Sequence, residues 1–150
     1  TSPEGAIDRP MNPLALALSQ GATFVARGFA LDIQHLVAIM VEALRHRGYA
    51  LIDVLQPCVS FNRPMSYEWY RERVYKVEDT QHDPADRQAA LDKAFEYPSG
   101  ERIPVGIIYR TEDVPSYEEQ VSTLKAEALT AQPLPFRPME DYHQLLKEFM

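Results

Sequence analysis

Residues 50–58 read Ala50-Leu51-Ile52-Asp53-Val54-Leu55-Gln56-Pro57-Cys58, and the fold class of the chain follows from this segment. A nearly continuous apolar run that ends at a proline is typical of a parallel strand buried on both faces of its sheet. Ligands of open α/β proteins bind just beyond the carboxyl ends of such strands. The segment therefore predicts an α/β fold and places Cys58 where chemistry is common.

The clearest helix of the chain comes directly before this strand. Asp32 is a suitable N-cap, and apolar residues then recur at helical spacing, which predicts a helix from Asp32 to Arg47 with one apolar face turned inward. That face consists of Ile33, Leu36, Val37, Met40, Val41 and Leu44. The basic residues at 45–47 suit the negative end of the helix dipole, and Gly48 suits the C′ position.

A further strand, predicted at residues 22–26, precedes this helix, after a proline-rich lead-in and a short helix over residues 14–19 that stops at Gly21. The order strand, helix, buried strand is that of a βαβ unit with a right-handed crossover. We therefore expect a three-layer α/β core with parallel strands near Thr23–Ala26 and Leu51–Leu55.

The second half of the chain predicts one more strand and several helices. The run Ile103–Tyr109 is β-branched and joins the same sheet in this prediction, as an edge strand or a partly broken one, because Pro104 and Gly106 interrupt it. Four helices are predicted, of which the first is aromatic-rich and spans 66–75, and the second is polar and runs from Asp83-Pro84 to about Phe95. The third is opened by a capping box at 116–119, and its inward residues are Tyr117, Val121, Leu124 and Ala128. The fourth is the terminal helix, with Tyr142, Leu145, Leu146 and Phe149 on one face.

The composition restricts the classes of partner. The 150 residues suit one domain, and the formal charge of −7 argues against nucleic acids and acidic membranes, since phosphate neutralisation needs clustered Lys and Arg. No apolar run approaches the roughly 18–20 residues that span a bilayer, and no signal peptide is visible. A single cysteine cannot form an internal disulfide, which fits the reducing cytoplasm.

Cys58 is the main candidate for chemistry. One thiolate cannot complete a zinc or iron–sulfur site, because such sites need about four protein ligands, so any metal ligands besides Cys58 would lie outside these residues. The alternative is a small buried hydrophobe, since free cysteines are often buried. A nucleophilic role is disfavoured because His35 and His46 belong to the preceding helix, at no spacing that marks a Cys–His pair.

Other polar residues are interpreted as structural. Asp53 within a buried strand needs a partner, and we expect a hydrogen bond from a neighbouring backbone amide or from Arg27. His82 and His143 are expected to be solvated or to lie in loops. Residues Arg71, Arg73 and Lys76 could form an anion site, but a solvated helix face interleaved with glutamates is favoured by the charge pattern. We therefore predict no catalytic residue within the chain.

Three segments carry a family resemblance. Residues Gly21–Gly28, Ala50–Asn62 and Tyr67–Tyr75 resemble, in order and spacing, the β subunit of 2-oxoacid:ferredoxin oxidoreductases. The lead-in at Thr1–Gly5 and Arg9–Pro13 is similar to that subunit as well, while the remainder, which includes 103–109, resembles its more variable C-terminal extension.

The resemblance implies an enzyme that oxidatively decarboxylates a 2-oxoacid on thiamine diphosphate, forms an acyl-CoA and passes electrons through iron–sulfur clusters to ferredoxin. In that family the cysteine of the Gln-Pro-Cys motif is the last of four thiolates on a [4Fe–4S] cluster, which implies that Cys58 is a cluster ligand. The other three cysteines, and the Gly-Asp-Gly…Asn segment that holds Mg²⁺ and the diphosphate, belong to the amino-terminal half of that subunit.

The resemblance also implies a division of the chain and a set of partners. Residues 1–78 would form the carboxyl-terminal part of the thiamine diphosphate-binding domain, with a mainly parallel sheet, and residues 79–150 an extension packed on it. The partners would be the amino-terminal half of the subunit, an α subunit and ferredoxin, in an oligomer. No cofactor is expected on this chain alone, and the isolated chain is expected to be inactive. The alternative is a non-catalytic α/β interaction domain in which Cys58 is merely buried.

Overall fold

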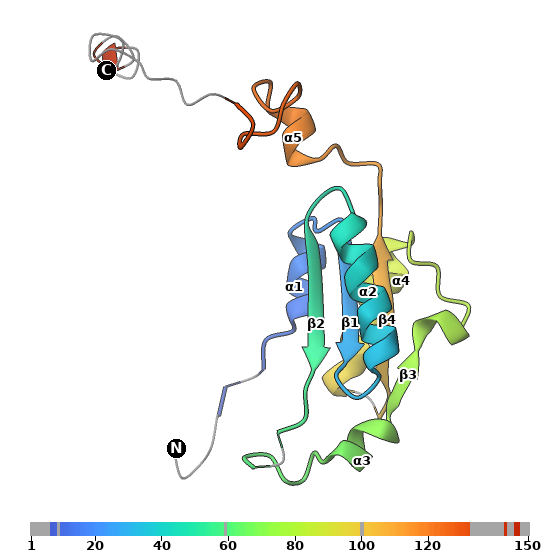
Figure 1. Cartoon of the computed structure of the whole chain (residues 1–150). Helices are drawn as coiled ribbons and strands as arrows, with labels where there is room; N and C mark the ends of the chain where they lie inside the picture. The colour runs from blue at the N-terminus through green and yellow to red at the C-terminus, as the bar shows by residue number, and fades with distance from the viewer. Residues whose placement is uncertain are drawn as a thin grey trace. The chain divides into compact units, whose positions relative to one another are not determined.

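The computed structural model describes residues 7–8, 10–58, 60–99, 101–132, 143 and 146–147. Residues 1–116 form one compact unit and residues 117–150 a second one. The sheet and its covering helices all belong to the first unit (Figure 1). The predicted division at residue 78 concerns the assembled subunit and stays a prediction.

The predicted βαβ unit is confirmed. Strand β2 (Ala50–Leu55) runs parallel to β1 (Phe24–Phe29), in a register that pairs the first and last residues of the two strands. Helix α2 (Ile33–Arg45) connects them, and the Asp32 carboxylate caps it by accepting a hydrogen bond from the backbone N–H of His35 at 3.1 Å. Both termini of the helix therefore lie within two residues of their predicted positions.

The sheet contains four strands in the order β2-β1-β4-β3. Strand β4 (Ile103–Arg110) runs antiparallel to β1, and the short β3 (Val74–Lys76) runs parallel to β4. The prediction that residues 103–109 join the sheet is confirmed, but the edge alternative is wrong, because β4 lies between two neighbours.

Strand β4 accommodates its proline and glycine in two ways. Its ladder with β1 ends at Gly106, so Pro104 lies beyond the paired stretch on that side and its missing N–H breaks no bond there. The register of the ladder shifts opposite Val25 and Ala26, and Gly106 has a φ of +123° that a residue with a side chain rarely adopts. The strand is therefore partly broken, as the second alternative predicted.

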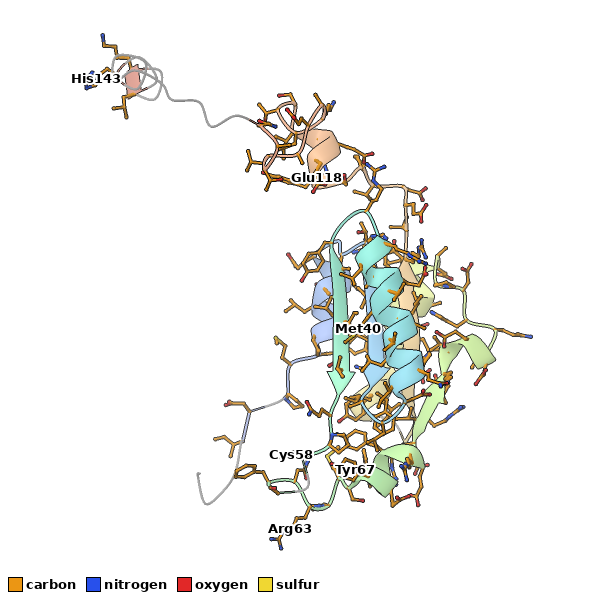
Figure 2. The ribbon with its side chains drawn as sticks, viewed as in Figure 1. Met40, Cys58, Arg63, Tyr67, Glu118 and His143 are labelled. Atoms are coloured by element: carbon orange, nitrogen blue, oxygen red, sulfur yellow. The ribbon has the colours of Figure 1, made fainter. Side chains whose placement is uncertain are left out.

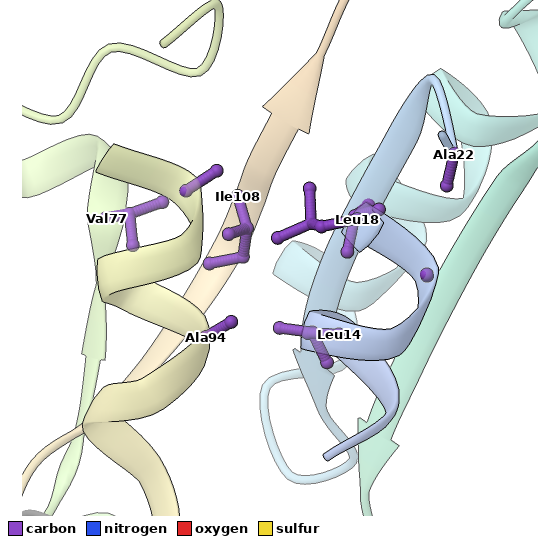
Figure 3. Close-up of a cluster of buried hydrophobic side chains, with 9 residues drawn as sticks. Leu14, Leu18, Ala22, Val77, Ala94 and Ile108 are labelled. Atoms are coloured by element: carbon purple, nitrogen blue, oxygen red, sulfur yellow. The ribbon is translucent and has the colours of Figure 1, made fainter. Parts of the chain in front are cut away.

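Helices cover both faces of the sheet, which confirms the three-layer architecture. Helices α1 (Pro13–Ser19) and α4 (Arg87–Ser99) lie on one face, where Leu14 and Leu18 of α1 and Ala94 of α4 pack around Ile108 of β4 (Figure 3). Helix α2 lies on the other face, where Ile39 packs against Phe24. Successive residues of β1 alternate between these two cores, as a pleated strand requires.

The predicted inward face of α2 is wrong for five of its six residues, and only Leu36 of the six is partly buried, beside Gly28 of β1. Only Ile39 of this helix is fully buried, and the partly buried Ala43 packs beside it. The exposed apolar side chains of the helix are Ile33, Val37, Met40, Val41 and Leu44. The side of the helix that meets the sheet instead carries Ile39 and Ala43, which pack with Phe24 and Ala26 of β1. At the margin of this contact, Arg110 Nη1 of β4 donates to Glu42 Oε2 at 2.9 Å, in an ion pair that is about one-third exposed.

Two helices of the middle segment differ from their predicted extents. Helix α3 (Tyr67–Arg71) is shorter than predicted, because the β-branched Val74 begins β3 and the N–H of Ile103 donates to the Arg73 carbonyl at 2.8 Å. Helix α4 begins at Arg87 because the Asp86 carboxylate accepts from the backbone at its start, whereas Asp83 accepts from Ala85 in a turn. A short 3₁₀ helix (Val77–Asp79) follows β3.

In the described part of the second unit, the helix that begins at residue 117 is shorter than the sequence predicts. Helix α5 spans only Tyr117–Gln120, so the longer helix with Tyr117, Val121, Leu124 and Ala128 inward is wrong, and Tyr117 itself is exposed. Four residues cannot form a stable helix without packing. Of the predicted terminal helix, Tyr142, Leu145 and Phe149 lie outside the described residues, and Leu146 is exposed.

A search of the described part of the chain finds no helix with the length and apolar character that crossing a membrane requires.

Candidate functional site

Cys58 follows the carboxyl end of β2 by three residues, and its side chain is exposed (Figure 2). Backbone hydrogen bonds fix the chain on both sides of it: the N–H of Ala30 donates to the Leu55 carbonyl at 3.0 Å, and the N–H of Asn62 donates to the Cys58 carbonyl at 2.9 Å. Its strand-end position agrees with the prediction, and the alternative of a small buried hydrophobe is wrong. An exposed thiol at this edge is available to a ligand or a partner.

The residues around this thiol do not form a complete metal site. The described ranges contain no group of three or more His, Cys, Asp or Glu side chains that could hold a metal ion. A single thiol supplies one ligand of the roughly four that zinc or an iron–sulfur cluster needs. Cys58 could therefore hold a metal or a cluster only together with ligands from another polypeptide segment.

Arg27 and Asp53 form an ion pair near the carboxyl ends of β1 and β2. They are register partners in the parallel ladder, and Arg27 Nε donates to Asp53 Oδ2 at 2.8 Å. The guanidinium is fully buried under the ring of Tyr97, at 5.4 Å from its centroid. This contact confirms the predicted partner of Asp53 and gives both residues a structural role.

Tyrosines complete the buried surroundings of this pair. Tyr70 of α3 packs against Phe29 of β1, with the ring centroids 6.0 Å apart. Burial, with further contributions from Tyr97 and Asp53, raises the pKa of Tyr70 to about 12, so its hydroxyl stays protonated at physiological pH. This aromatic group supports the strand ends from which the Cys58 segment departs.

None of the histidines is paired with Cys58 in the described contacts, and His46 and His82 contact other parts of the fold. His46, one of the predicted cations at the end of α2, is buried, with its Nε2 2.8 Å from Thr23 Oγ1. Burial lowers the pKa of His46, so the expected positive charge is wrong there. His82 lies in a loop, as one of the two predicted alternatives has it, and a ring nitrogen of His82 is 2.8 Å from the Ile108 carbonyl. His143 is exposed, as predicted.

The cations considered as an anion site are neutralised by carboxylates. Arg71 pairs with Glu68 at 3.1 Å, and Arg73 pairs with Glu72 at 3.2 Å. These contacts favour the predicted solvated face over an anion site.

The sequence did not predict a cavity at the carboxyl end of β1. It measures about 750 Å³ and is lined by Phe29, Asp32 and Lys76, among others. Lys76 Nζ lies 2.8 Å from Asp32 Oδ2, and this hydrogen bond holds the pKa of Asp32 below its ordinary value and the pKa of Lys76 above it. One sequence feature could have indicated this cavity: the carboxylate of Asp32 lies three residues after the end of β1. Its partner Lys76 could not be found in the same way, because the sequence places Lys76 on the solvated face of a helix, whereas it lies at the end of β3.

Comparison with known proteins agrees with this geometry. A profile of the family described as pyruvate ferredoxin oxidoreductase β subunit, C terminal, matches residues 58–126 and thus begins at Cys58. The chain is 45% identical over 129 residues to a 2-oxoacid:ferredoxin oxidoreductase β subunit of a Sulfolobus species, covering 79% of this chain and 42% of that one. It is 39% identical to the corresponding subunit of Saccharolobus solfataricus, covering 97% of this chain and 52% of the relative.

This chain is a relative of the 2-oxoacid:ferredoxin oxidoreductase β subunits. It resembles their carboxyl-terminal half and spans about half the length of the curated relatives it matches. A solved 2-oxoglutarate:ferredoxin oxidoreductase from Magnetococcus marinus, with 2-oxoglutarate, coenzyme A and succinyl-CoA bound, has the same fold over 95% of this chain, with a TM-score of 0.74 and 27% identity. The match covers 47% of that chain. The predicted resemblance is thereby confirmed in both sequence and structure.

Proposed function

We propose that this chain forms the carboxyl-terminal part of the β subunit of a cytoplasmic 2-oxoacid:ferredoxin oxidoreductase. Such an enzyme oxidatively decarboxylates a 2-oxoacid to an acyl-CoA and transfers the electrons to ferredoxin. The observation that carries the proposal is the agreement of sequence with a β subunit over 97% of the chain, together with the agreement of fold with a 2-oxoglutarate:ferredoxin oxidoreductase chain over 95%. Activity would require the remaining half of the subunit, the α subunit and their assembly into an oligomer.

Cys58 would supply one thiolate to a [4Fe–4S] cluster. Three features of the residue fit this role: it carries the only thiol of the chain, it is exposed, and it follows the carboxyl end of a parallel strand. The described residues contain no group of three or more side chains that could hold a metal ion, and Cys58 is the one cysteine of the sequence, so the other thiolates would come from the amino-terminal half. The cluster, when bound, would accept and pass on single electrons.

Thiamine diphosphate and Mg²⁺ would be held by the amino-terminal half as well. When bound, thiamine diphosphate supplies the electron sink for decarboxylation. The proposed task of this chain is positioning: the Arg27–Asp53 pair fixes β1 against β2, and the backbone bonds of Ala30 and Asn62 hold the segment that carries Cys58. In this proposal, residues 1–78 belong to the thiamine diphosphate-binding domain and residues 79–150 to its extension.

A chimera tests this function. In it, the chain replaces the matching half of the Saccharolobus solfataricus β subunit and is co-expressed with the other subunit of that enzyme; the parental enzyme is the control. We expect the chimera to reduce ferredoxin in a reaction that depends on both a 2-oxoacid and coenzyme A. A chimera that folds and assembles like the parent, but reduces no ferredoxin with any of pyruvate, 2-oxoglutarate or branched-chain 2-oxoacids, would overturn the proposal in favour of a non-catalytic interaction domain.

A further inference from the structure

The outer edge of β2 is open in the described part of the chain. β1 is the only strand paired with β2 in the four-stranded sheet, so the backbone groups along the other side of β2 have no strand partner there. Its sequence, Ala50–Leu55, is that of a strand buried on both faces, yet most of its residues are only partly buried. Strand β2 therefore has the sequence of a central strand but lies at the edge of the described sheet.

Exposed apolar side chains flank this edge on the α2 side of the sheet. Val37 of α2 is 52% exposed and Leu44 is 87% exposed, and with Ile33, Met40 and Val41 they form the stripe that the sequence predicted to face inward. Val54 of β2, on the same face of the strand as the core residue Ile52, is 37% exposed. Monomeric proteins rarely leave so continuous an apolar surface to water.

Apolar surface also flanks the edge on the α1 side. A groove of about 430 Å³ lies there, and its lining includes Leu16 of α1, Leu51 of β2 and Tyr49 directly before β2. Leu16 and Tyr49 are themselves exposed. The open edge of β2 therefore has uncovered apolar surface on both faces of the sheet.

The opposite edge of the sheet is built differently. Strand β3 is only three residues long, and Lys76 at its end is paired with Asp32. Short strands with charged residues are the usual protection of a true sheet edge. Among the described strands, β2 alone combines an open edge with apolar flanks.

We infer that the edge of β2 and its two apolar flanks are the docking surface for the amino-terminal half of the β subunit, which adds a strand to β2 and packs elements against the α2 stripe and the α1 groove. This inference rests on the proposed function. More than half of the Magnetococcus marinus chain lies outside the match and must pack somewhere, and an occupant of that size can cover both flanks at once.

A second copy of this chain fits the surface less well. A two-fold axis would pair β2 with itself in antiparallel orientation. The apolar run of β2, by contrast, is typical of a strand with parallel neighbours on both sides and both faces covered. Self-association is therefore an outcome for the experiment to exclude.

Cysteine labelling tests the surface. Val37→Cys and Val54→Cys are introduced singly with Cys58 retained, both in this chain alone and in the chimera described above, and peptide mass spectrometry follows the maleimide labelling of each introduced cysteine separately from that of Cys58. We expect labelling to slow by about tenfold or more in the chimera relative to the chain alone. Val114→Cys, with 49% of the native side chain exposed and a position after β4, is the matched control and should label equally in both proteins.

Hydrogen exchange of the peptide that contains β2 tests the added strand separately. Its amides should exchange about tenfold more slowly in the chimera than in the chain alone. Equal labelling in both proteins would overturn the docking surface, and protection of the cysteines without slower exchange would overturn the strand addition. Protection in the chain alone that grows with its concentration would assign the surface to a second copy. Ferredoxin reduction by the chimera is a separate measurement. A chimera that shows protection but reduces no ferredoxin would therefore retain the docking surface and contradict only the proposed function.

Discussion

Arg27 and Asp53 face each other across the parallel ladder of β1 and β2, with Arg27 Nε 2.8 Å from Asp53 Oδ2. A slip of one residue in either strand would turn one of the two charges to the other face of the sheet. The pair therefore specifies the register of two strands whose other side chains are mostly apolar and could pair in several ways. It also explains why a carboxylate interrupts the apolar run of β2.

Removal of the carboxylate should destabilise the fold strongly. Asp53→Ala leaves the guanidinium of Arg27, whose side chain is 2% exposed, without its ionic partner. The expected loss is about 3 kcal/mol in the free energy of unfolding, measured by urea denaturation followed by circular dichroism. Glu68→Ala is the control: its pair with Arg71 is largely exposed, and its loss should change the free energy by about 0.5 kcal/mol or less. Equal effects of the two substitutions would contradict the structural role of the Arg27–Asp53 pair.

Two glycines with positive φ separate backbone strain from steric conflict. Gly21→Ala, at a φ of +85° and with open space around the new Cβ, should cost about 1 kcal/mol from the backbone conformation alone. Gly106→Ala, at a φ of +123°, would also bring its Cβ against the carboxylate of Glu78, but this carboxylate is the end of a flexible, half-exposed side chain that can move aside, so the steric conflict should add about 1 kcal/mol or less.

Thermal or urea unfolding of both glycine variants measures the difference. Glu78→Ala together with Gly106→Ala should recover the part of the loss that comes from steric conflict. If Gly106→Ala is far more destabilising than Gly21→Ala and the double variant recovers the difference, the Glu78 carboxylate is held against β4 and cannot move aside.

His46 should make stability decrease as pH falls below about 7. Burial lowers the pKa of His46 in the folded chain from its ordinary value of 6.5, so as pH falls the unfolded chain binds this proton first. Stability should therefore be fully retained above about pH 7 and decrease as pH falls through 6.5 toward the folded-state pKa.

The His46→Phe variant should lose this dependence, because the ring packing against Phe24 is kept and the titrating group is removed. Urea midpoints at a series of pH values provide the measurement. The hydrogen bond from Lys76 lowers the pKa of Asp32, whose ordinary value is 3.8, so that group acts only at lower pH. An unchanged pH dependence in His46→Phe would show that another group titrates in this range.

The parts of the fold that the sequence predicts correctly are those determined by a few neighbouring residues, where no contact with a distant segment changes the local preference. The apolar run of β2, the cap at Asp32 and the breaks at Gly21 and Gly48 each act over a few residues, and the structure contains the predicted βαβ unit. The orientation of α2 could not be predicted in this way, because it depends on contacts with other elements, such as the packing of Ile39 against Phe24, that the periodicity of the helix does not indicate.

The candidate site was predictable to a similar degree. The position of Cys58 follows from the strand before it, whereas its exposure depends on what packs around residues 58–62, which no periodicity indicates. Strand β3 was missed because its three residues, Val74–Lys76, are too few to show a period of two and follow a helix without a break. The partner of Asp53 was predictable, because Arg27 is the basic residue of the neighbouring strand β1 and a carboxylate within an apolar strand needs such a partner.

Cys58→Ser tests the proposed cluster ligand directly. The side chain is exposed and serine is nearly the same size, so the free energy of unfolding of the isolated chain should change by about 0.5 kcal/mol or less. In the chimeric β subunit, the same substitution should lower iron content and ferredoxin reduction together, because a hydroxyl oxygen is a poor replacement for a thiolate on iron. Iron analysis and electron paramagnetic resonance of the reduced protein measure the first effect, and Ser60→Ala, two residues along the chain, is the control. A full complement of unperturbed [4Fe–4S] signal in the Cys58→Ser chimera would exclude Cys58 as an essential ligand and leave its exposed thiol without a role in electron transfer.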